Sequence, residues 1–142
     1  MQFALQLAAL LWAAPVTLVG LCFAVPIRLS GGKISWHTDG QSQAWEASGG
    51  SAPWLLNRLS LFQPVDAITF GHIILARDAA VATSLRAHEH EHIRQYQRCG
   101  IFFPVAYFVA GVVARLRGKD AYWDNLFEID ARAADAKIKS KH

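Results

Sequence analysis

The chain has 142 residues, of which 53% are hydrophobic and 18% are charged, and it contains two cysteines. This hydrophobic share exceeds what a domain of such length needs for one core, so a simple water-soluble protein is excluded. The net charge of +3 comes from dispersed basic residues without a recognition motif. It therefore suits an anionic membrane surface and argues against nucleic acid as a partner.

The first predicted element is a long apolar helix. Residues 3–27 form an uncharged run that is long enough to cross a hydrocarbon core of about 30 Å. A cleaved signal peptide is the alternative, but no Lys or Arg precedes the run, it is longer than a usual signal core and it lacks a small-x-small cleavage site. We therefore predict residues 1–27 as the transmembrane anchor of a single-pass protein. All 14 Lys and Arg residues follow it, which slightly favours a cytoplasmic domain.

Residues 28–66 are predicted as a loop-rich connecting region. Ser30 to Gly50 is rich in Gly, Ser and other polar residues, with one short strand expected at Lys33 to His37. Pro53 to Phe62 has the apolar spacing of a short amphipathic helix. Packing against the core is the default for this helix, and contact with lipid is the alternative.

A strand and a long helix are expected next. Ala67 to Leu75 is apolar, rich in β-branched residues and too short for a long helix, so it predicts one strand. The run from Asp78 to Arg98 contains no Gly or Pro and predicts a helix. Asp78 is a suitable N-cap, and Gly100 is a suitable end.

The apolar run from Ile101 to Ala114 would form about 21 Å of helix, which is short of a full membrane crossing. It is expected to be a buried core helix, an interfacial helix or a re-entrant helix. A full crossing would also carry the last helix, expected to begin near Asn125, to the opposite side of the membrane from the long helix.

The long helix carries the letters HEHEH at residues 88–92, which contain one complete H-E-x-x-H element. His88 and His92 lie four residues apart, so both imidazoles reach one zinc ion from the same helix face. Glu89 lies about 60° from the midline between them, which makes it the expected general base, whereas His90 lies about 160° away. The alternative is a solvated helix face of alternating His and Glu.

A catalytic zinc needs a third protein ligand and one position open to water. Glu128 is the best candidate, because no other downstream residue offers a comparable ligand. Ala131 shares its helix face and would let the two helices approach closely. Asp135 on that face and Gln95 on the first helix are expected to orient the ligands. The alternative for Glu128 is a capping box with Asn125, which has the required spacing.

These residues resemble those of the gluzincins, which are zinc metallopeptidases with H-E-x-x-H on one helix and a glutamate on a later one. The resemblance rests on residues 88–95, which match H-E-x-x-H-x-x-Q, and on residues 128–131, which match E-x-[DE]-A. The chain is also similar to a set of small bacterial membrane-associated proteins. These share a strand, the metal helix, a Gly-Ile-Phe-Phe-Pro-like turn and an Asn-x-Phe-Glu helix in the order found over residues 67–135.

The resemblance implies a minimal zincin-like domain over residues 67–142 that binds Zn²⁺. The implied ligands are His88, His92 and Glu128, and the implied base and proton shuttle is Glu89. In such enzymes Glu89 would take a proton from water and pass it to the leaving amine.

The resemblance also implies that an extended peptide or protein segment pairs with an edge strand beside the metal. The expected substrate contacts are therefore Phe70, His72 and Ile74, although a strand that only covers the helix is the alternative. Tyr107 and Tyr122 are further candidates for polarising a carbonyl, but packing is the expected role for both.

The sequence thus predicts an α+β, mainly helical protein, with an N-terminal transmembrane helix and a minimal zincin-like domain of one short strand and three helices. We expect a membrane-anchored zinc-dependent peptidase that hydrolyses peptide bonds in a membrane-near protein or peptide. One alternative is a non-catalytic zinc-stabilised membrane protein or adaptor, whose fourth metal ligand would be Asp135 or His72. The other is a metal-handling protein that binds several ions weakly.

Overall fold

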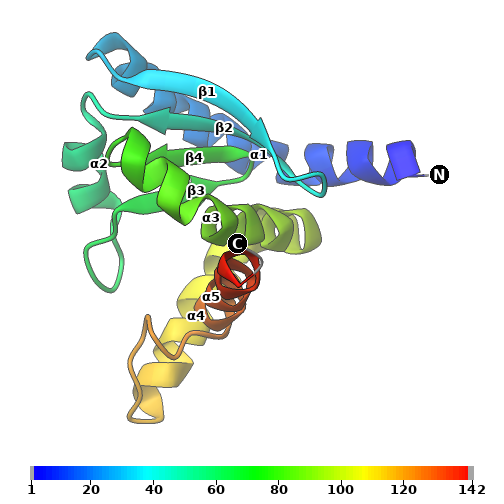
Figure 1. Cartoon of the computed structure of the whole chain (residues 1–142). Coiled ribbons are helices and arrows are strands. Elements are labelled where there is room, and N and C mark those ends of the chain that lie inside the picture. The colour runs from blue at the N-terminus through cyan, green and yellow to red at the C-terminus, as the bar shows by residue number, and fades with distance from the viewer. Residues whose placement is uncertain (1, 141–142) are drawn as a thin grey trace.

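The computed structural model describes residues 2–140 and has a mainly helical α+β architecture, as predicted (Figure 1). In chain order the described elements are α1 (Gln2–Leu29), β1 (Lys33–Thr38), β2 (Gln43–Ser48), α2 (Ala52–Leu59), β3 (Ala67–Phe70), β4 (Ile73–Ala76), α3 (Ala79–Cys99), a 3₁₀ turn η1 (Gly100–Phe102), α4 (Phe103–Leu116) and α5 (Leu126–Lys139).

The four described strands form one mixed sheet in the order β1-β2-β4-β3. β1 and β2 form an antiparallel hairpin, β2 runs parallel to β4, and β4 pairs antiparallel with β3. The register places Trp36 opposite Trp45 and Trp45 opposite Ile73. β1 and β3 are therefore the two free edges of the sheet, and β4 is central.

The single strand predicted over residues 67–75 is wrong, because the chain reverses within it at Gly71-His72 and forms the β3–β4 hairpin. Gly71 has a positive φ of 61°, and a Cβ atom there would lie 2.2 Å from Oγ1 of Thr17 in α1. Only glycine fits this turn. His72 consequently lies in the turn, and Ile74 lies in a central strand.

The structure also differs from the loop-rich expectation for residues 28–66, which contain β1, β2 and α2. The predicted strand at Lys33 to His37 is confirmed as β1. The predicted short helix is present as α2, but it ends at Leu59, so Phe62 lies in the following loop. β2 contains a buried charge at Glu46, which is satisfied by Arg86 of α3 at 2.6 Å. Such a partner, 40 residues away, is invisible to local sequence patterns.

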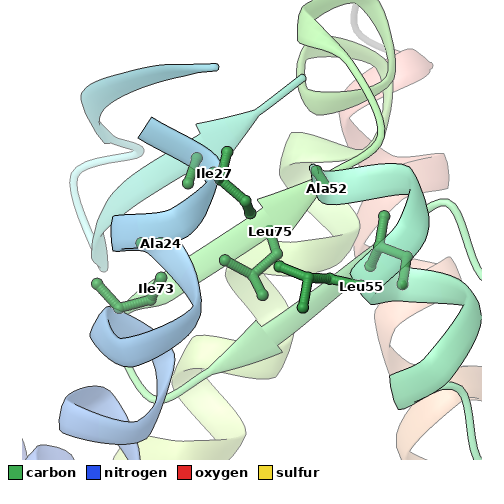
Figure 2. Packing of buried hydrophobic residues seen from close by; sticks show 8 residues of the cluster. Ala24, Ile27, Ala52, Leu55, Ile73 and Leu75 are labelled. Atoms are coloured by element: carbon green, nitrogen blue, oxygen red, sulfur yellow. The ribbon is translucent and has the colours of Figure 1, made fainter. Parts of the chain in front are cut away.

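The main hydrophobic core joins the N-terminal helix to the sheet (Figure 2). Ile73 and Leu75 project from one face of β4 and pack with Ala24 and Ile27 of α1 and with α2. Ile74 projects from the other face and packs with Ile93 of α3. α1 and α2 therefore cover one face of the sheet and α3 covers the other, so the predicted anchor and connecting region share one core with the later segment.

α1 contacts the sheet through a narrow seam of mostly small side chains. The seam repeats at intervals of four and three residues and consists of Ala13, Thr17, Gly20, Ala24 and Ile27; its first member, Ala13, lies beyond the sheet and packs on Tyr96 of α3 and Phe103 of α4. At its centre a Cβ on Gly20 would lie 2.7 Å from Cβ of Ile73, so the helix backbone touches the sheet directly. Most other large apolar side chains of α1 point away from the sheet, such as Leu18 at 63% exposure, whereas Phe23 packs on Phe70 of β3 with ring centres 5.4 Å apart.

Two helical stretches within the described residues are long and apolar enough to cross a membrane, namely Leu7–Leu29 and Ala79–Leu116. The first lies within α1. The second combines α3, η1 and α4, and its apolar part is the exposed stripe of α4.

The predicted limits of the long helix are confirmed. Asp78 Oδ1 accepts a hydrogen bond of 2.8 Å from the Val81 amide at the start of α3. The helix ends at Gly100, whose positive φ of 58° and contact with Trp12 exclude a side chain. α4 then leads away from the sheet, and α5 returns to pack against α3 (Figure 1).

At Gly20 the seam leaves no room for a side chain. Gly20→Leu should lower the stability of the protein by about 1–3 kcal/mol, because the added side chain overlaps Ile73. Cys22→Leu is the matched control, since Cys22 is exposed on the same helix. Melting temperature in detergent measures both variants. Equal melting of Gly20→Leu and wild type would show that α1 does not pack on the sheet in this way.

Candidate metal centre

Three ligand atoms from two helices converge at one buried point. His88 and His92 project from α3 and Glu128 projects from α5, and all three side chains are buried. Nε2 of His88 lies 3.2 Å from Nε2 of His92 and 3.2 Å from Oε2 of Glu128, and Nε2 of His92 lies 3.3 Å from Oε1 of Glu128. The three residues that the sequence nominated as ligands are therefore brought together, in a group that is suited to hold a metal ion.

These separations match the geometry of a small tetrahedral ion. Ligand bonds of about 2.1 Å at tetrahedral angles place neighbouring ligand atoms about 3.4 Å apart. The observed distances of 3.2–3.3 Å are close to this value. Oε2 of Glu128 is also buried without a hydrogen-bond partner among the described residues. A cation between the three side chains would satisfy it, so the donor set fits a metal.

Gln95 holds one imidazole in the form that binds metal. Its Oε1 atom lies 2.8 Å from Nδ1 of His92, and its Nε2 atom donates to the backbone oxygen of Phe127 in α5 at 3.0 Å. Because the amide oxygen only accepts, Nδ1 of His92 carries the proton and Nε2 keeps its lone pair for the metal. Gln95 thus lies beside the ligands, as predicted from the sequence, and links α3 to α5.

Tyr107 of α4 contacts the third ligand from the opposite side. Its hydroxyl donates to Oε1 of Glu128 at 2.8 Å. Burial, together with the neighbouring Glu128 carboxylate, raises the pKa of Tyr107, so the hydroxyl stays protonated and remains a donor. Sequence reasoning expected only packing from this tyrosine and missed this bond.

The cluster binds a proton strongly when no metal is present. Burial opposes charge on His92, but its contacts with Glu128 raise the pKa of His92 to about 9. Burial also opposes charge on Glu128, yet the close contacts with His88 and His92 hold the pKa of Glu128 well below its usual value. A carboxylate therefore faces a protonated imidazole at the position where a metal would replace the proton.

Glu89 lies beside the cluster on the same helix. Its carboxylate is buried, and Oε2 accepts a hydrogen bond of 2.7 Å from Oγ1 of Thr69 in β3. The edge strand therefore fixes the position of the predicted base. Nothing in the local sequence around Thr69 signals this role, because the contact joins residues 20 positions apart.

A largely apolar cavity of about 250 Å³ opens over the cluster. Its floor includes the three ligands and Glu89. One wall is the free edge strand β3, and the others come from α4 and from the loop before β3, which contributes Phe62. Phe62 stacks on Phe108 of α4 with ring centres 5.9 Å apart, so this loop bridges to α4 beside the cavity.

Of the expected substrate contacts, Phe70 lines this cavity, and the other two do not. Ile74 is buried in the central strand β4, where it packs with Ile93. His72 contacts Thr17 of α1 and Gln97 of α3 instead. The expectation for these two residues is therefore corrected, because the hairpin turns His72 toward α1 and buries Ile74. Ile68 and Thr69 of β3 line the cavity instead.

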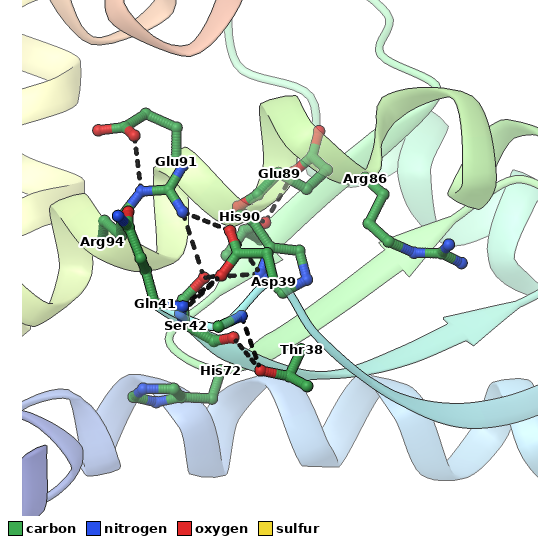
Figure 3. A network of polar contacts seen from close by, with 12 residues as sticks. Thr38, Asp39, Gln41, Ser42, His72, Arg86, Glu89, His90, Glu91 and Arg94 are labelled. Atoms are coloured by element: carbon green, nitrogen blue, oxygen red, sulfur yellow. Dashed lines mark hydrogen bonds and ion pairs between the residues drawn. The ribbon is translucent and has the colours of Figure 1, made fainter. Parts of the chain in front are cut away.

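The remaining polar residues of the motif form contacts on the opposite side of α3 (Figure 3). His90 is fully buried, and its Nδ1 atom lies 2.6 Å from Oγ of Ser42 in the β1–β2 turn. Asp39 of the same turn pairs with Arg94 of α3 at 2.5 Å, and Arg94 also pairs with Glu91. His90 points away from the metal ligands as predicted, and this network ties α3 to the sheet. The solvated face of alternating His and Glu is therefore not observed.

Asp135 does not join the cluster. Its carboxylate pairs with Nζ of Lys139 at 2.7 Å, and no bond from it to the three ligands exists within residues 2–140. The expected orienting role of Asp135 is therefore wrong, because its side chain forms an ion pair with Lys139 on the next turn of α5. The capping alternative for Glu128 is not observed either, since Asn125 caps α5 through the Phe127 amide while Glu128 faces the histidines. Ala131 is fully buried, consistent with close packing of the helix.

Comparison of the chain with known protein families, with curated proteins and with solved structures finds no match. The site is therefore interpreted from its own geometry.

Removing any one ligand should greatly reduce metal binding. His88→Ala, His92→Ala and Glu128→Ala should each lower metal affinity by at least about tenfold, because each supplies one of three converging atoms. His37→Ala is the matched control, since His37 is a half-buried histidine that pairs with Glu46 away from the cluster. Elemental analysis of the purified proteins measures the metal content. Normal content in all three variants would place the metal elsewhere.

The metal-free protein should lose stability as the pH rises. The raised pKa of His92 means that its charge stabilises the fold fully below its usual value of 6.5, and that this contribution disappears as the pH rises through about 9. The lowered pKa of Glu128 means that its contribution is lost only as the pH falls below its usual value of 4.5.

The melting temperature of EDTA-treated protein should therefore decline as the pH rises from 6.5 to about 9. The melting temperature of zinc-loaded protein should not decline over this range, because the metal replaces the proton. Glu128→Gln should abolish the decline. Identical pH profiles with and without zinc would contradict this assignment.

Proposed function

We propose that this protein is a membrane-associated zinc-dependent peptidase that cleaves extended segments of membrane-near proteins or peptides. The observation that carries the proposal is a three-ligand cluster on the floor of a cavity, with a buried carboxylate and a free strand edge beside it. This set comprises the parts that hydrolysis of a peptide bond requires.

Zinc is the metal that the ligand set favours. Two imidazole nitrogens and one carboxylate at tetrahedral spacing are typical of catalytic zinc, whereas magnesium and calcium prefer sites made only of oxygen. Zinc bound at this position would polarise a carbonyl oxygen and acidify a water molecule.

Glu89 is the residue that moves the proton. As the water oxygen attacks the carbonyl carbon, Glu89 takes one proton from the water and then gives it to the nitrogen of the leaving amine. The hydrogen bond from Thr69 keeps its carboxylate beside the ligands during both transfers. Tyr107 and Gln95 hold Glu128 and His92 in place.

The free edge of β3 supplies a surface for the substrate backbone. An extended peptide that pairs with β3 would run along the wall of the cavity over the ligands. Its side chains would meet Phe62, Phe70 and Phe103, so apolar residues near the scissile bond are favoured. The apolar helix α1 attaches the enzyme to the membrane, close to such substrates.

A structural metal is the second candidate, and one observation separates it from catalysis. A structural zinc site has four protein ligands, and the side chains nominated for the fourth position were Asp135 and His72. Both are bonded elsewhere, to Lys139 and to Thr17 with Gln97. A fourth position open to water, as catalysis requires, is favoured by this arrangement.

Replacement of Glu89 tests the proposed reaction. Glu89→Gln should retain zinc and fold normally while losing turnover by about 10²–10⁴-fold, because the amide no longer accepts a proton. The assay follows cleavage of a fluorogenic peptide library by the full chain in detergent. Glu91→Gln is the matched control, since Glu91 lies on the same helix and pairs with Arg94. Undiminished cleavage by Glu89→Gln would reject the mechanism, and zinc binding without cleavage by the wild type would support a structural metal.

A further inference from the structure

We infer that α1 lies along one leaflet of an anionic membrane with the α1-covered face of the sheet against the lipid, instead of crossing the bilayer. The inference concerns how the protein meets the membrane and does not depend on zinc or catalysis.

The two sides of α1 have the composition of a lipid-facing helix. The seam against the sheet is made mostly of small residues, and the opposite side carries large apolar ones, including Leu11 at 66% exposure and Leu18 at 63%. A helix that faced water would have the reverse arrangement, with its large apolar side chains in the core. Small residues at a packed helix face and large apolar residues outside are typical of helices in lipid.

Packing along the seam argues against a crossing. Of the candidate span Leu7–Leu29, the stretch from Thr17 to Ile27 packs on the sheet, and Ala13 packs on the helices α3 and α4. If this stretch lay in the hydrocarbon core, the sheet would be immersed with it. The free edge of β1 and the exposed Lys33 would then lie in lipid without partners. Unpaired strand edges are not tolerated at that depth.

Tryptophans mark the same side of the protein. Trp45 is opposite Ile73 in the sheet register, and Ile73 faces α1, so Trp45 and its partner Trp36 lie on the α1-covered face. Their rings meet edge to face at 5.0 Å and both are exposed. Trp54 of α2, on the same face, is 57% exposed. In membrane proteins, tryptophan is enriched at the level of the lipid headgroups.

The charges on this side are complementary to an anionic surface. Residues 1–38 contain no Asp or Glu, whereas Arg28 and Lys33 follow the apolar run and Arg58 stacks over Trp54 at 4.4 Å. The next acidic residues along the chain, Asp39 and Glu46, form ion pairs with arginines of α3 on the opposite face, and the exposed Asp66 is paired with Arg77. The basic side therefore faces the membrane, and the acidic partners face away.

α4 extends the same apolar surface. Phe102 just before it meets Trp12 of α1 with ring centres 6.0 Å apart. The exposed side chains of α4 recur at helical spacing, at Val105, Phe108, Val109 and Val112. Their continuity with α1 places α4 in the same leaflet, so the metal cavity, which α4 helps to line, lies at the membrane surface.

Depth measurements at single cysteines test the inference. Cys22 is exposed on the outer side of α1, so Cys99→Ser leaves one native thiol there. Leu11→Cys, Leu18→Cys and Val25→Cys, each with Cys22→Ser and Cys99→Ser, add three exposed positions on that side. The full chain carries a nitroxide at each site in vesicles of phosphatidylcholine with phosphatidylglycerol. Collision rates with oxygen and with a water-soluble nickel chelate report the depth.

All four labels should lie at one shallow depth, although residues 11 and 25 are about 21 Å apart along the helix. A label at Thr83→Cys, an exposed position on α3, should stay in water. Three outcomes would overturn the inference. A depth maximum near residue 18 would mean a crossing, strong spin–spin broadening with low oxygen access would mean a dimer through α1, and water-exposed labels would mean no membrane contact.

Discussion

The convergence of two imidazoles and a carboxylate from separate helices is the constraint on which the other features depend. A buried carboxylate facing two histidines at 3.2–3.3 Å requires a proton or a cation between them. Both α3 and α5 must therefore lie on the same side of any membrane, so α4 cannot cross one between them. The same constraint fixes the cavity, because α4 leaves the cluster and α5 returns to it, placing Tyr107 and the apolar face of α4 around the ligands.

The helices could be predicted from the sequence, and most of the sheet could not. Asp78 and Gly100 limit α3 by their own backbone preferences, which are local properties. The β3–β4 hairpin depends on a glycine turn that is tight because Thr17 of α1 packs against it, a contact with no local signal. β2 was missed because its inward-facing Glu46 breaks the apolar alternation, and its partner Arg86 lies on a later helix. Contacts between residues far apart in the sequence therefore determine the strand arrangement of the sheet.

In the candidate site too, local features could be predicted from the sequence and distant contacts could not. Helical periodicity placed His88, His92 and Gln95 on one face and sent His90 to the other, and these positions agree with the structure. The tertiary partners of the site, Thr69 and Tyr107, could not be predicted, because they reach Glu89 and Glu128 across about twenty positions of chain. Asp135 shares the helical face of Glu128, yet it pairs with Lys139 one turn later instead of with the cluster. Helical spacing alone does not distinguish between these two partners.

The cavity combines the metal cluster, the free strand edge and an apolar wall that continues into the exposed surfaces of α1 and α4. Under the proposed function, this arrangement would direct the site toward chains that emerge from or lie on a membrane. Zinc-edge X-ray absorption on the zinc-loaded protein tests the central claim of an open metal centre most directly. The account predicts four ligands at about 2.0–2.1 Å, two of them imidazole nitrogens and two of them oxygens. A third imidazole or a sulfur ligand would contradict it.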